Sequence, residues 1–180
     1  MFFKKLSLVT GGFDPIHSGH ISYFTRAKDF SDYLVVGLNT EEWLTKKKGQ
    51  YFQSWIERAE IIRHLDMVDA VITVPDDDKG SACGAIAKCL EIAETVVFCN
   101  GWDRGKSNTP ETDLYGEDPR VQFEFGIGGD DKMNSSSWIL KGYFERQRKL
   151  LGIWIVGTVA LNWFGVGIMT LTIMKIWSMI

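Results

Sequence analysis

The 180-residue chain is poor in the residues that build metal sites and disulfide frameworks, with only three cysteines and three histidines. Cys83, Cys89 and Cys99 contain no CxxC pair and are odd in number, so we expect reduced thiols in the cytosol. Positive charge is not in excess either. Residues 1–149 hold 19 basic and 23 acidic residues, a formal charge of −4. This balance argues against a nucleic-acid-binding surface, and we expect no nucleic acid among the partners.

Charge is missing altogether from the 25 residues Leu150–Met174, which are mostly apolar. About 20 such residues suffice to cross a bilayer, and a soluble helix rarely stays apolar on every face for so long. Four basic residues lie shortly before this run and only Lys175 follows it, so the positive-inside rule places the preceding residues in the cytoplasm. We therefore predict a domain over residues 1–149, a transmembrane helix over 150–174 and a short tail over 175–180. The alternatives are a hydrophobic helix buried against a partner and an artefactual end of the sequence.

Within residues 1–149, short apolar runs alternate with segments of helical periodicity. This alternation predicts an α/β fold, a parallel sheet sandwiched by helices, with the alternating fifth strand nearer an edge. The predicted strands are Lys4–Thr10, Asp32–Asn39, Asp69–Val74, Thr95–Asn100 and Val121–Phe125. The predicted helices are Ser18–Asp29, Glu41–Thr45, Ser54–Leu65, Gly80–Ile92 and Ser135–Gln147. Ser18 and Ser54 are the expected N-caps, and a basic loop is expected after Thr45. Asn100–Pro119 is expected to be a long irregular loop, of a length that is usually functional or mobile.

The stretch TGGFDPIHSGHI, Thr10–Ile21, joins the first predicted strand to the first helix. Gly11 and Gly12 allow positive φ and a close approach of the backbone. The start of the helix offers unpaired N–H groups that suit an anion, and His17 and His20 lie at that start. The pattern is neither GxxxxGK[ST] nor GxGxxG. It predicts a site for a nucleoside triphosphate, in which the imidazoles donate to phosphate oxygens.

Two other interpretations of this stretch stay open. A zinc site at His17 and His20 would need a third ligand, and no candidate lies nearby in the sequence. The histidines could also be two surface side chains in a turn.

GGFDPIHSGH resembles the HxGH signature of the nucleotidyltransferase superfamily, which includes glycerol-3-phosphate cytidylyltransferases and heptose-phosphate adenylyltransferases. The family's second signature, close to [I/C]-S-[ST]-T-x-[IL], is similar to NSSSWIL, residues 134–140. Its glutamate–arginine pair is similar to Glu57 and Arg58, and its GD-type loop is similar to VVFCNGWDR, residues 96–104. The resemblance covers about Lys4–Tyr143. It implies the nucleotidylyl transferase fold, which is Rossmann-like.

The resemblance implies that a phosphate or phosphonate oxygen of an acceptor attacks the α-phosphorus of CTP or ATP, and that pyrophosphate leaves. Positioning and charge stabilisation then carry the catalysis, with Mg²⁺ expected alongside the nucleotide. The predicted catalytic residues are His17, His20, Lys47 and Lys48. The predicted nucleotide-binding residues are Thr10, Gly11, Gly12, Phe13, Asp14, Gly19, Arg58, Gly101, Asp103, Arg104, Ser135, Ser136 and Ser137. No protein ligand to a metal is predicted.

Several of these assignments have plainer alternatives. The serines could be a helix cap, Glu57 and Arg58 a solvated ion pair, and the lysine run a hydrated surface. Asp130 stands where the glycerol-3-phosphate enzymes have an arginine, which argues against glycerol phosphate as the acceptor. KMNSS, residues 132–136, also echoes the second motif of class I aminoacyl-tRNA synthetases, but the chain is short for one and has no basic tRNA-binding domain.

The sequence as a whole favours a membrane-anchored cytidylyltransferase over an adenylyltransferase, with its catalytic domain facing the cytoplasm. Its expected partners are CTP or ATP, a phosphorylated small molecule and the membrane, and a homodimer stays open. The competing interpretation is a membrane-tethered nucleotide-binding protein that uses the same fold without turnover.

Overall fold

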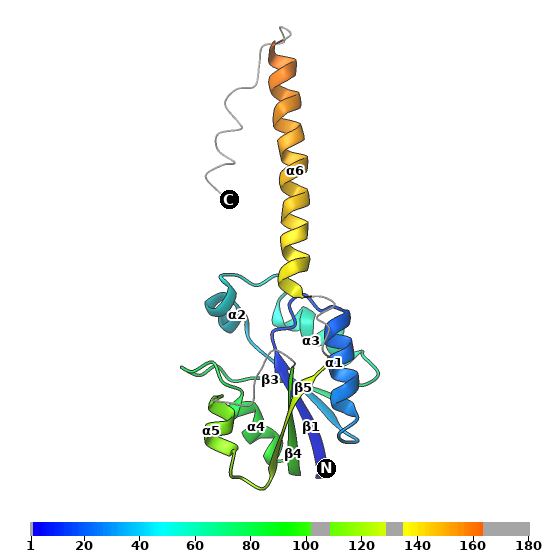
Figure 1. The fold of residues 1–180 in the computed structure, drawn as a ribbon, viewed down its shortest axis with the longest axis vertical. Helices are drawn as coiled ribbons and strands as arrows, with labels where there is room; N and C mark the ends of the chain where they lie inside the picture. The colour runs from blue at the N-terminus through cyan, green and yellow to red at the C-terminus, as the bar shows by residue number, and fades with distance from the viewer. Residues whose placement is uncertain (1, 102–108, 129–134, 164–180) are drawn as a thin grey trace. The chain divides into compact units, whose positions relative to one another are not determined.

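A computed structural model describes residues 2–101, 109–128 and 135–163, with side chains described up to Leu150. Its centre is a sheet of five parallel strands in the order β3–β2–β1–β4–β5 (Figure 1). The strands are β1 (Phe3–Gly11), β2 (Leu34–Leu38), β3 (Ala70–Thr73), β4 (Ala93–Gly101) and β5 (Val121–Ile127). The predicted parallel sheet is confirmed, including β5 at an edge. The strand order reverses between β1 and β4, and open α/β sheets bind ligands at the carboxyl ends of such a pair.

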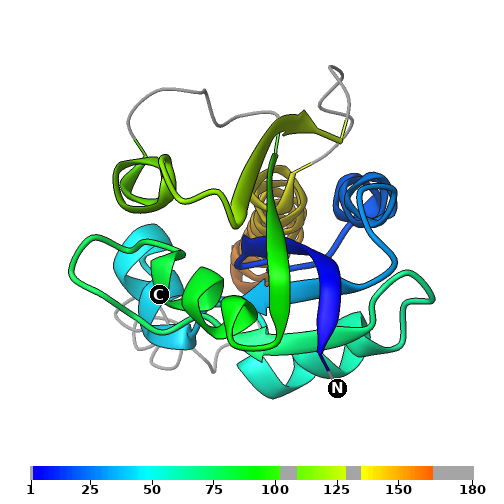
Figure 2. The same cartoon turned by 90° about the horizontal axis from the view of Figure 1, so that it is seen from below.

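Helices cover both faces of this sheet because the central strands are apolar on both sides. All five residues of β2 are buried. On one face, α4 (Cys83–Leu90) packs Ala85 and Ile86 against Leu8 and Phe98. On the other, α1 (Ser18–Lys28) and α3 (Trp55–Arg63) pack against the opposite side chains of the same strands. Figure 2 shows α1 in blue on one side of the sheet and α4 in green on the other.

Two segments differ from the sequence-based expectation. The lysines expected in a loop after Thr45 instead complete α2 (Glu41–Lys48), which ends at Gly49 with a φ of 84°. Gly49 can adopt this left-handed conformation without the steric cost of a side chain, so the helix continues through the whole lysine run. The stretch Asn100–Pro119, expected to be irregular, contains α5 (Pro110–Tyr115), which begins on a capping box between Thr109 and Thr112.

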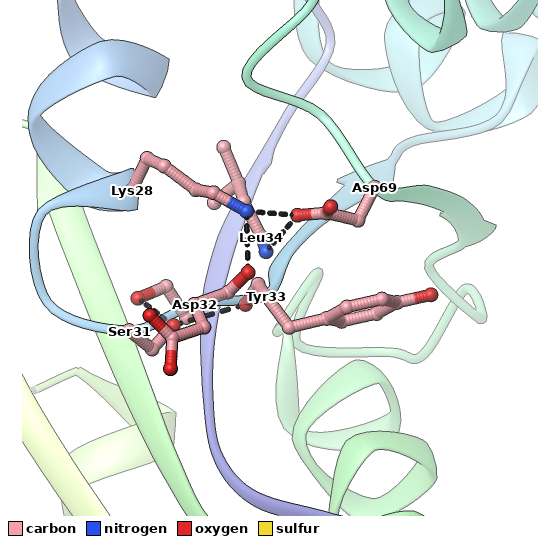
Figure 3. Close-up of polar contacts among 7 residues, drawn as sticks. Lys28, Ser31, Asp32, Tyr33, Leu34 and Asp69 are labelled. Atoms are coloured by element: carbon pink, nitrogen blue, oxygen red, sulfur yellow. Dashed lines mark hydrogen bonds and ion pairs between the residues drawn. The ribbon is translucent and has the colours of Figure 1, made fainter. Parts of the chain in front are cut away.

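Polar contacts connect the amino ends of β2 and β3, at the opposite end of the strands from the first turn (Figure 3). The Asp69 carboxylate accepts the backbone N–H of Leu34 at 2.7 Å and forms an ion pair with Lys28. The Lys28 ammonium also donates to the carbonyl of Asp32 at 2.6 Å. These bonds connect the end of α1 to the start of two strands, so they stabilise the fold away from the candidate site.

The chain divides into two compact units, Met1–Ser136 and Ser137–Ile180. Within the second, the helix predicted over Ser135–Gln147 belongs to a longer one, α6 (Ser136–Trp163). In the part of the chain that the structure describes, no helix is both long enough and apolar enough to cross a membrane. Residues 164–174 of the predicted span, and the side chains of 151–163, lie outside the described residues.

Candidate active site

His17 and His20 form a reciprocal capping box at the start of α1. The Nδ1 atom of His17 accepts the backbone N–H of Gly19 at 3.1 Å, and the Nδ1 atom of His20 accepts the backbone N–H of His17 at 3.3 Å. The two rings stack with their centroids 3.6 Å apart. The N-cap is therefore His17, one residue before the predicted Ser18, because an imidazole nitrogen here takes the place of the usual hydroxyl or carboxylate.

These bonds determine which nitrogen of each ring carries the hydrogen. A ring nitrogen that accepts a hydrogen bond has no proton, so in the neutral imidazole the proton is on Nε2. Both histidines thus have an Nε2–H donor beside the N-terminus of α1. Burial, followed by electrostatic interactions with His17 and Lys48, lowers the pKa of His20 to about 3. His20 is therefore neutral at physiological pH and can donate a hydrogen bond through Nε2.

The backbone before these histidines differs from the prediction at Gly11 and Gly12. The positive φ falls on Phe13, at 47°, and on neither of these glycines. The glycines are instead required for space, because a Cβ on Gly11 would lie 2.9 Å from the Phe13 ring and one on Gly12 would lie 2.6 Å from Leu44 Cδ2. Phe13 is buried and its ring meets that of His20 edge-on at 5.0 Å. The close approach that the two glycines permit is present here, and the positive φ that they also permit is not adopted.

Asp14 lies at the centre of the first-turn loop, which we define as residues 12–17. Its carboxylate is 2% exposed and accepts the backbone N–H groups of Phe52 and Gln53 at 2.6 and 2.9 Å. Both oxygens are used to hold the segment before α3 against the first-turn loop. Direct contact of Asp14 with a nucleotide stays a prediction.

Arg58 is buried behind the first-turn loop and is only 1% exposed. Its Nη1 donates to the carbonyls of Gly12 and Asn39, at 2.8 and 2.9 Å, and its Nε donates to the carbonyl of Gln53 at 3.0 Å. Its Nη2 is buried and has no hydrogen-bond partner in the described part of the chain. A solvated ion pair with its neighbour Glu57, which is exposed, is therefore excluded. Through these carbonyls Arg58 positions the chain after β1 and β2, and its contact with a nucleotide stays a prediction.

The structure places the two predicted catalytic lysines in different surroundings. Lys48 interacts electrostatically with His20 and with Asp14. Desolvation lowers the pKa of Lys48 below its ordinary value, while Asp14 opposes the shift. Lys47 instead holds its ammonium 5.7 Å from the centre of the Trp43 ring. Of the two, Lys48 is the one that adds positive charge beside the histidines.

The second predicted motif reaches the first one through Ser136. The Ser136 hydroxyl is buried and donates to the carbonyl of Pro15 at 2.8 Å. Ser135 precedes α6, and Ser137, which is exposed, begins the second compact unit. Gly101 ends β4 at the switch point. The predicted Asp103 and Arg104 lie outside the described residues.

Asn100 is a site candidate that the sequence-based prediction does not include. It precedes Gly101 at the carboxyl end of β4, next to β1. Its side chain is 2% exposed, and its Nδ2 has no hydrogen-bond partner in the described part of the chain. A buried donor without a partner costs about 1–3 kcal/mol, which makes this amide a candidate to contact a ligand. In the sequence, the signal that could have identified Asn100 was its position at the end of the fourth predicted strand.

The described residues contain no group of three or more His, Cys, Asp or Glu side chains placed to hold a metal ion. Zinc at the histidine pair gains no support from the geometry, because each Nδ1 is already a hydrogen-bond acceptor. Asp14, the acidic residue of the first motif, has both oxygens occupied as well.

The chain belongs to the cytidylyltransferase-like family, whose model matches residues 8–123. This match confirms the resemblance found in the HxGH stretch. The bifunctional protein HldE of Geobacter metallireducens is 29% identical over 147 residues, which cover 79% of this chain and 28% of that protein. The FAD synthase of Thermococcus sibiricus is 42% identical over 71 residues, which cover 38% of this chain and 48% of that protein. The chain thus spans less than a third of the length of HldE.

Solved structures share the same architecture. The lipopolysaccharide core biosynthesis protein from Thermoplasma volcanium matches with a TM-score of 0.54 at 23% identity, over 70% of this chain and 98% of that one. TmcAL of Thermotoga maritima, bound with alpha-thio ATP, matches with a TM-score of 0.54 at 17% identity, over 81% of this chain and 51% of that one. At these identities the likeness shows the fold alone.

Proposed function

We propose that the chain transfers a CMP or AMP group from CTP or ATP to a phosphorylated small molecule and releases pyrophosphate. The observation that carries the proposal is the histidine capping box. It holds both Nδ1 atoms on backbone N–H groups and so fixes both Nε2–H groups as donors at the start of α1. Membership of the cytidylyltransferase-like family supports it.

In the proposed reaction, a phosphate or phosphonate oxygen of the acceptor forms a bond to the α-phosphorus, while the bond from that phosphorus to the bridging oxygen breaks. The attacking oxygen is already anionic, so no protein base is needed. Negative charge grows on the phosphate oxygens and on the departing pyrophosphate. The Nε2–H groups of His17 and His20, the Lys48 ammonium and the N-terminus of α1 would stabilise that charge.

The low pKa of His20 defines its part in this scheme. The ring is neutral before a nucleotide binds, and in that state its Nε2–H can donate a hydrogen bond. The positive charge at this place would come from Lys48, which is the last residue of α2.

The proposal includes both CTP and ATP as the nucleotide donor. The sequence favours CTP. The relatives include an FAD synthase, and one of the solved neighbours, TmcAL, is bound with alpha-thio ATP. Both triphosphates are therefore tested as donors.

Mg²⁺ is expected to accompany the triphosphate. Mg²⁺ usually keeps several waters and binds through substrate phosphates, so phosphate oxygens and water would form much of its coordination shell. When bound, Mg²⁺ would offset part of the phosphate charge.

The full-length chain should release pyrophosphate from CTP or ATP when a suitable phosphorylated acceptor is present. The assay screens both nucleotides against polyol, sugar and headgroup phosphates, with the double variant H17A/H20A as the inactive control. Nucleotide binding without pyrophosphate release for any acceptor would instead favour a binding protein without turnover.

We also propose that residues 150–174 anchor the chain to a membrane, with the catalytic domain in the cytoplasm. The uncharged run and the basic residues before it support this proposal. Full-length protein should sediment with membranes and require detergent for extraction, and a Met1–Lys149 truncation should not. Full-length protein that stays in the soluble fraction without detergent would refute the anchor.

A further inference from the structure

The first half of α6 contains a short basic stretch, residues 141–149, which we call the basic segment. Within α6, which Figure 1 shows as one continuous helix, every side chain from Tyr143 to Leu150 is exposed. The exposed fraction is 45% for Tyr143 and 46% for Phe144, which is high for aromatic side chains. The basic segment ends directly before Leu150, where the uncharged run begins.

The charge of the basic segment is opposite to that of the residues before it. It holds four basic residues and one acidic residue, a formal charge of +3, whereas residues 1–140 hold 15 basic and 22 acidic residues, a formal charge of −7. Lys141 lies 4.0 Å from Glu145, and both side chains are exposed, so this ion pair contributes little. The other three basic residues form no ion pair in the described part of the chain. They are Arg146, Arg148 and Lys149.

The helix places its basic and its apolar side chains on different sides. At 3.6 residues per turn, the four basic side chains fall within about 160° of the circumference. Tyr143, Phe144 and Leu150 fall within about 120° of the remaining circumference, with Gln147 among them. A helix that is basic on one side and aromatic or aliphatic on the other is typical of segments that lie at a membrane surface.

The position of the basic segment favours lipid over other partners of opposite charge. Because α6 continues without a break to Trp163, all of the basic segment lies within about 13 Å of the start of the uncharged run along the helix. Long lysine and arginine side chains next to a membrane span extend toward the headgroups. A nucleic acid would meet the acidic charge of residues 1–140, which disfavours it.

We propose, on the basis of the proposed membrane anchor, that the basic segment binds the headgroups of anionic phospholipids and so selects the lipids around α6. Its four basic side chains contact the negatively charged headgroups. Tyr143 and Phe144, on the other side of the helix, lie at the boundary between headgroups and acyl chains. An anionic surface repels the acidic residues 1–140, so the attraction is confined to the basic segment.

The test measures which lipids surround the full-length chain in phosphatidylcholine bilayers. Trace amounts of spin-labelled phosphatidylglycerol, which is anionic, or of spin-labelled phosphatidylcholine are added, and electron paramagnetic resonance gives the fraction of each lipid held against the protein. We expect phosphatidylglycerol to associate about twofold to fivefold more strongly in 0.1 M salt, as attraction to one basic side chain predicts. The preference should approach one in 1 M salt. Equal association of the two lipids in 0.1 M salt would overturn the inference and leave the segment to a protein partner.

Variants locate the preference within the chain. Arg148→Gln/Lys149→Gln should remove at least about half of it, because each basic side chain near the surface contributes a similar attraction. Glu145→Gln, which removes the single negative charge of the basic segment, should strengthen it. Lys4→Gln/Arg26→Gln is the matched control, since it removes the same charge from exposed positions outside α6 and should change nothing. A preference that survives Arg148→Gln/Lys149→Gln unchanged, or that falls equally in the control, would overturn the inference.

The inference and the anchor fail in distinguishable ways when the full-length chain is floated with vesicles of defined composition. Retention on pure phosphatidylcholine vesicles after a wash in high salt, with equal association of the two labelled lipids, would support the anchor and overturn the inference. Flotation with vesicles that contain phosphatidylglycerol, lost in high salt and absent with pure phosphatidylcholine, would support the inference and overturn the anchor. Flotation with neither kind of vesicle would overturn both.

Discussion

Two substitutions of His20 distinguish its contribution to folding from its proposed contribution to catalysis. In asparagine, Oδ1 is attached to Cγ as Nδ1 is in histidine, so His20→Asn keeps an acceptor for the backbone N–H of His17. It removes the Nε2–H donor. His20→Ala removes both groups. Both variants also lose the ring that stacks on His17 and meets Phe13.

The expected sizes of the two effects differ between these variants. Loss of a capping bond costs about 0.5–2 kcal/mol, so His20→Ala should be less stable than His20→Asn by about 1 kcal/mol. Loss of a donor that stabilises transition-state charge costs about 10²–10³-fold in kcat, so both variants should be nearly inactive. Urea denaturation and pyrophosphate release at saturating nucleotide measure the two quantities. If His20→Asn keeps a kcat within about threefold of wild type, His20 does not contact the reacting phosphates.

Three further predictions concern pH, packing and the amino ends of β2 and β3. Because the pKa of His20 is about 3 in the fold and about 6.5 when unfolded, the unfolded state binds more protons between these values. The free energy of unfolding should therefore fall as the pH drops from 6.5 toward 3, and it should fall less steeply in His20→Asn. Urea denaturation between pH 7.5 and 5 measures this dependence, and the same dependence on pH in both proteins would contradict the prediction. Gly12→Ala should lower the free energy of unfolding by about 1–3 kcal/mol through its clash with Leu44, and by much less in a Leu44→Ala background. If the effects of the two substitutions simply add in the double-mutant cycle, the clash is not the cause. Asp69→Ala should lower the free energy of unfolding by about 1–3 kcal/mol because it leaves the N–H of Leu34 unpaired, and Asp69→Asn should lower it less. The kcat should be unchanged in both variants. A lowered kcat in folded protein would show that the amino ends of these strands affect the site.

The sheet and the position of its first turn could be predicted because their signals are local. A buried strand such as Leu34–Leu38 is one continuous apolar run, and parallel strands of this kind alternate with helices in the sequence. The turn after β1 is recognisable from the glycines, the proline and the two histidines within it. The secondary-structure elements and their order could therefore be predicted from the sequence without any knowledge of contacts between distant residues.

What the sequence could not provide depends on contacts between distant segments. The space that a side chain at position 12 would need is occupied by Leu44, which lies on α2. Arg58 is recognisable as part of a family motif, but its burial follows from carbonyls that β1 and β2 present to it. The separation of Lys47 from Lys48 follows from their positions on a helix that the sequence led us to end three residues earlier. Propensity alone does not reveal such relations.

The capping box also makes the state of the site measurable without any ligand. The two backbone amides that hold the imidazoles, those of Gly19 and His17, exchange with solvent only when these bonds open. Their deuterium uptake therefore reports how often the donors lose their orientation. A site whose donors are aligned by the first turn of its own helix is organised as soon as that turn folds, and nucleotide binding does not need to supply the free energy that orders it.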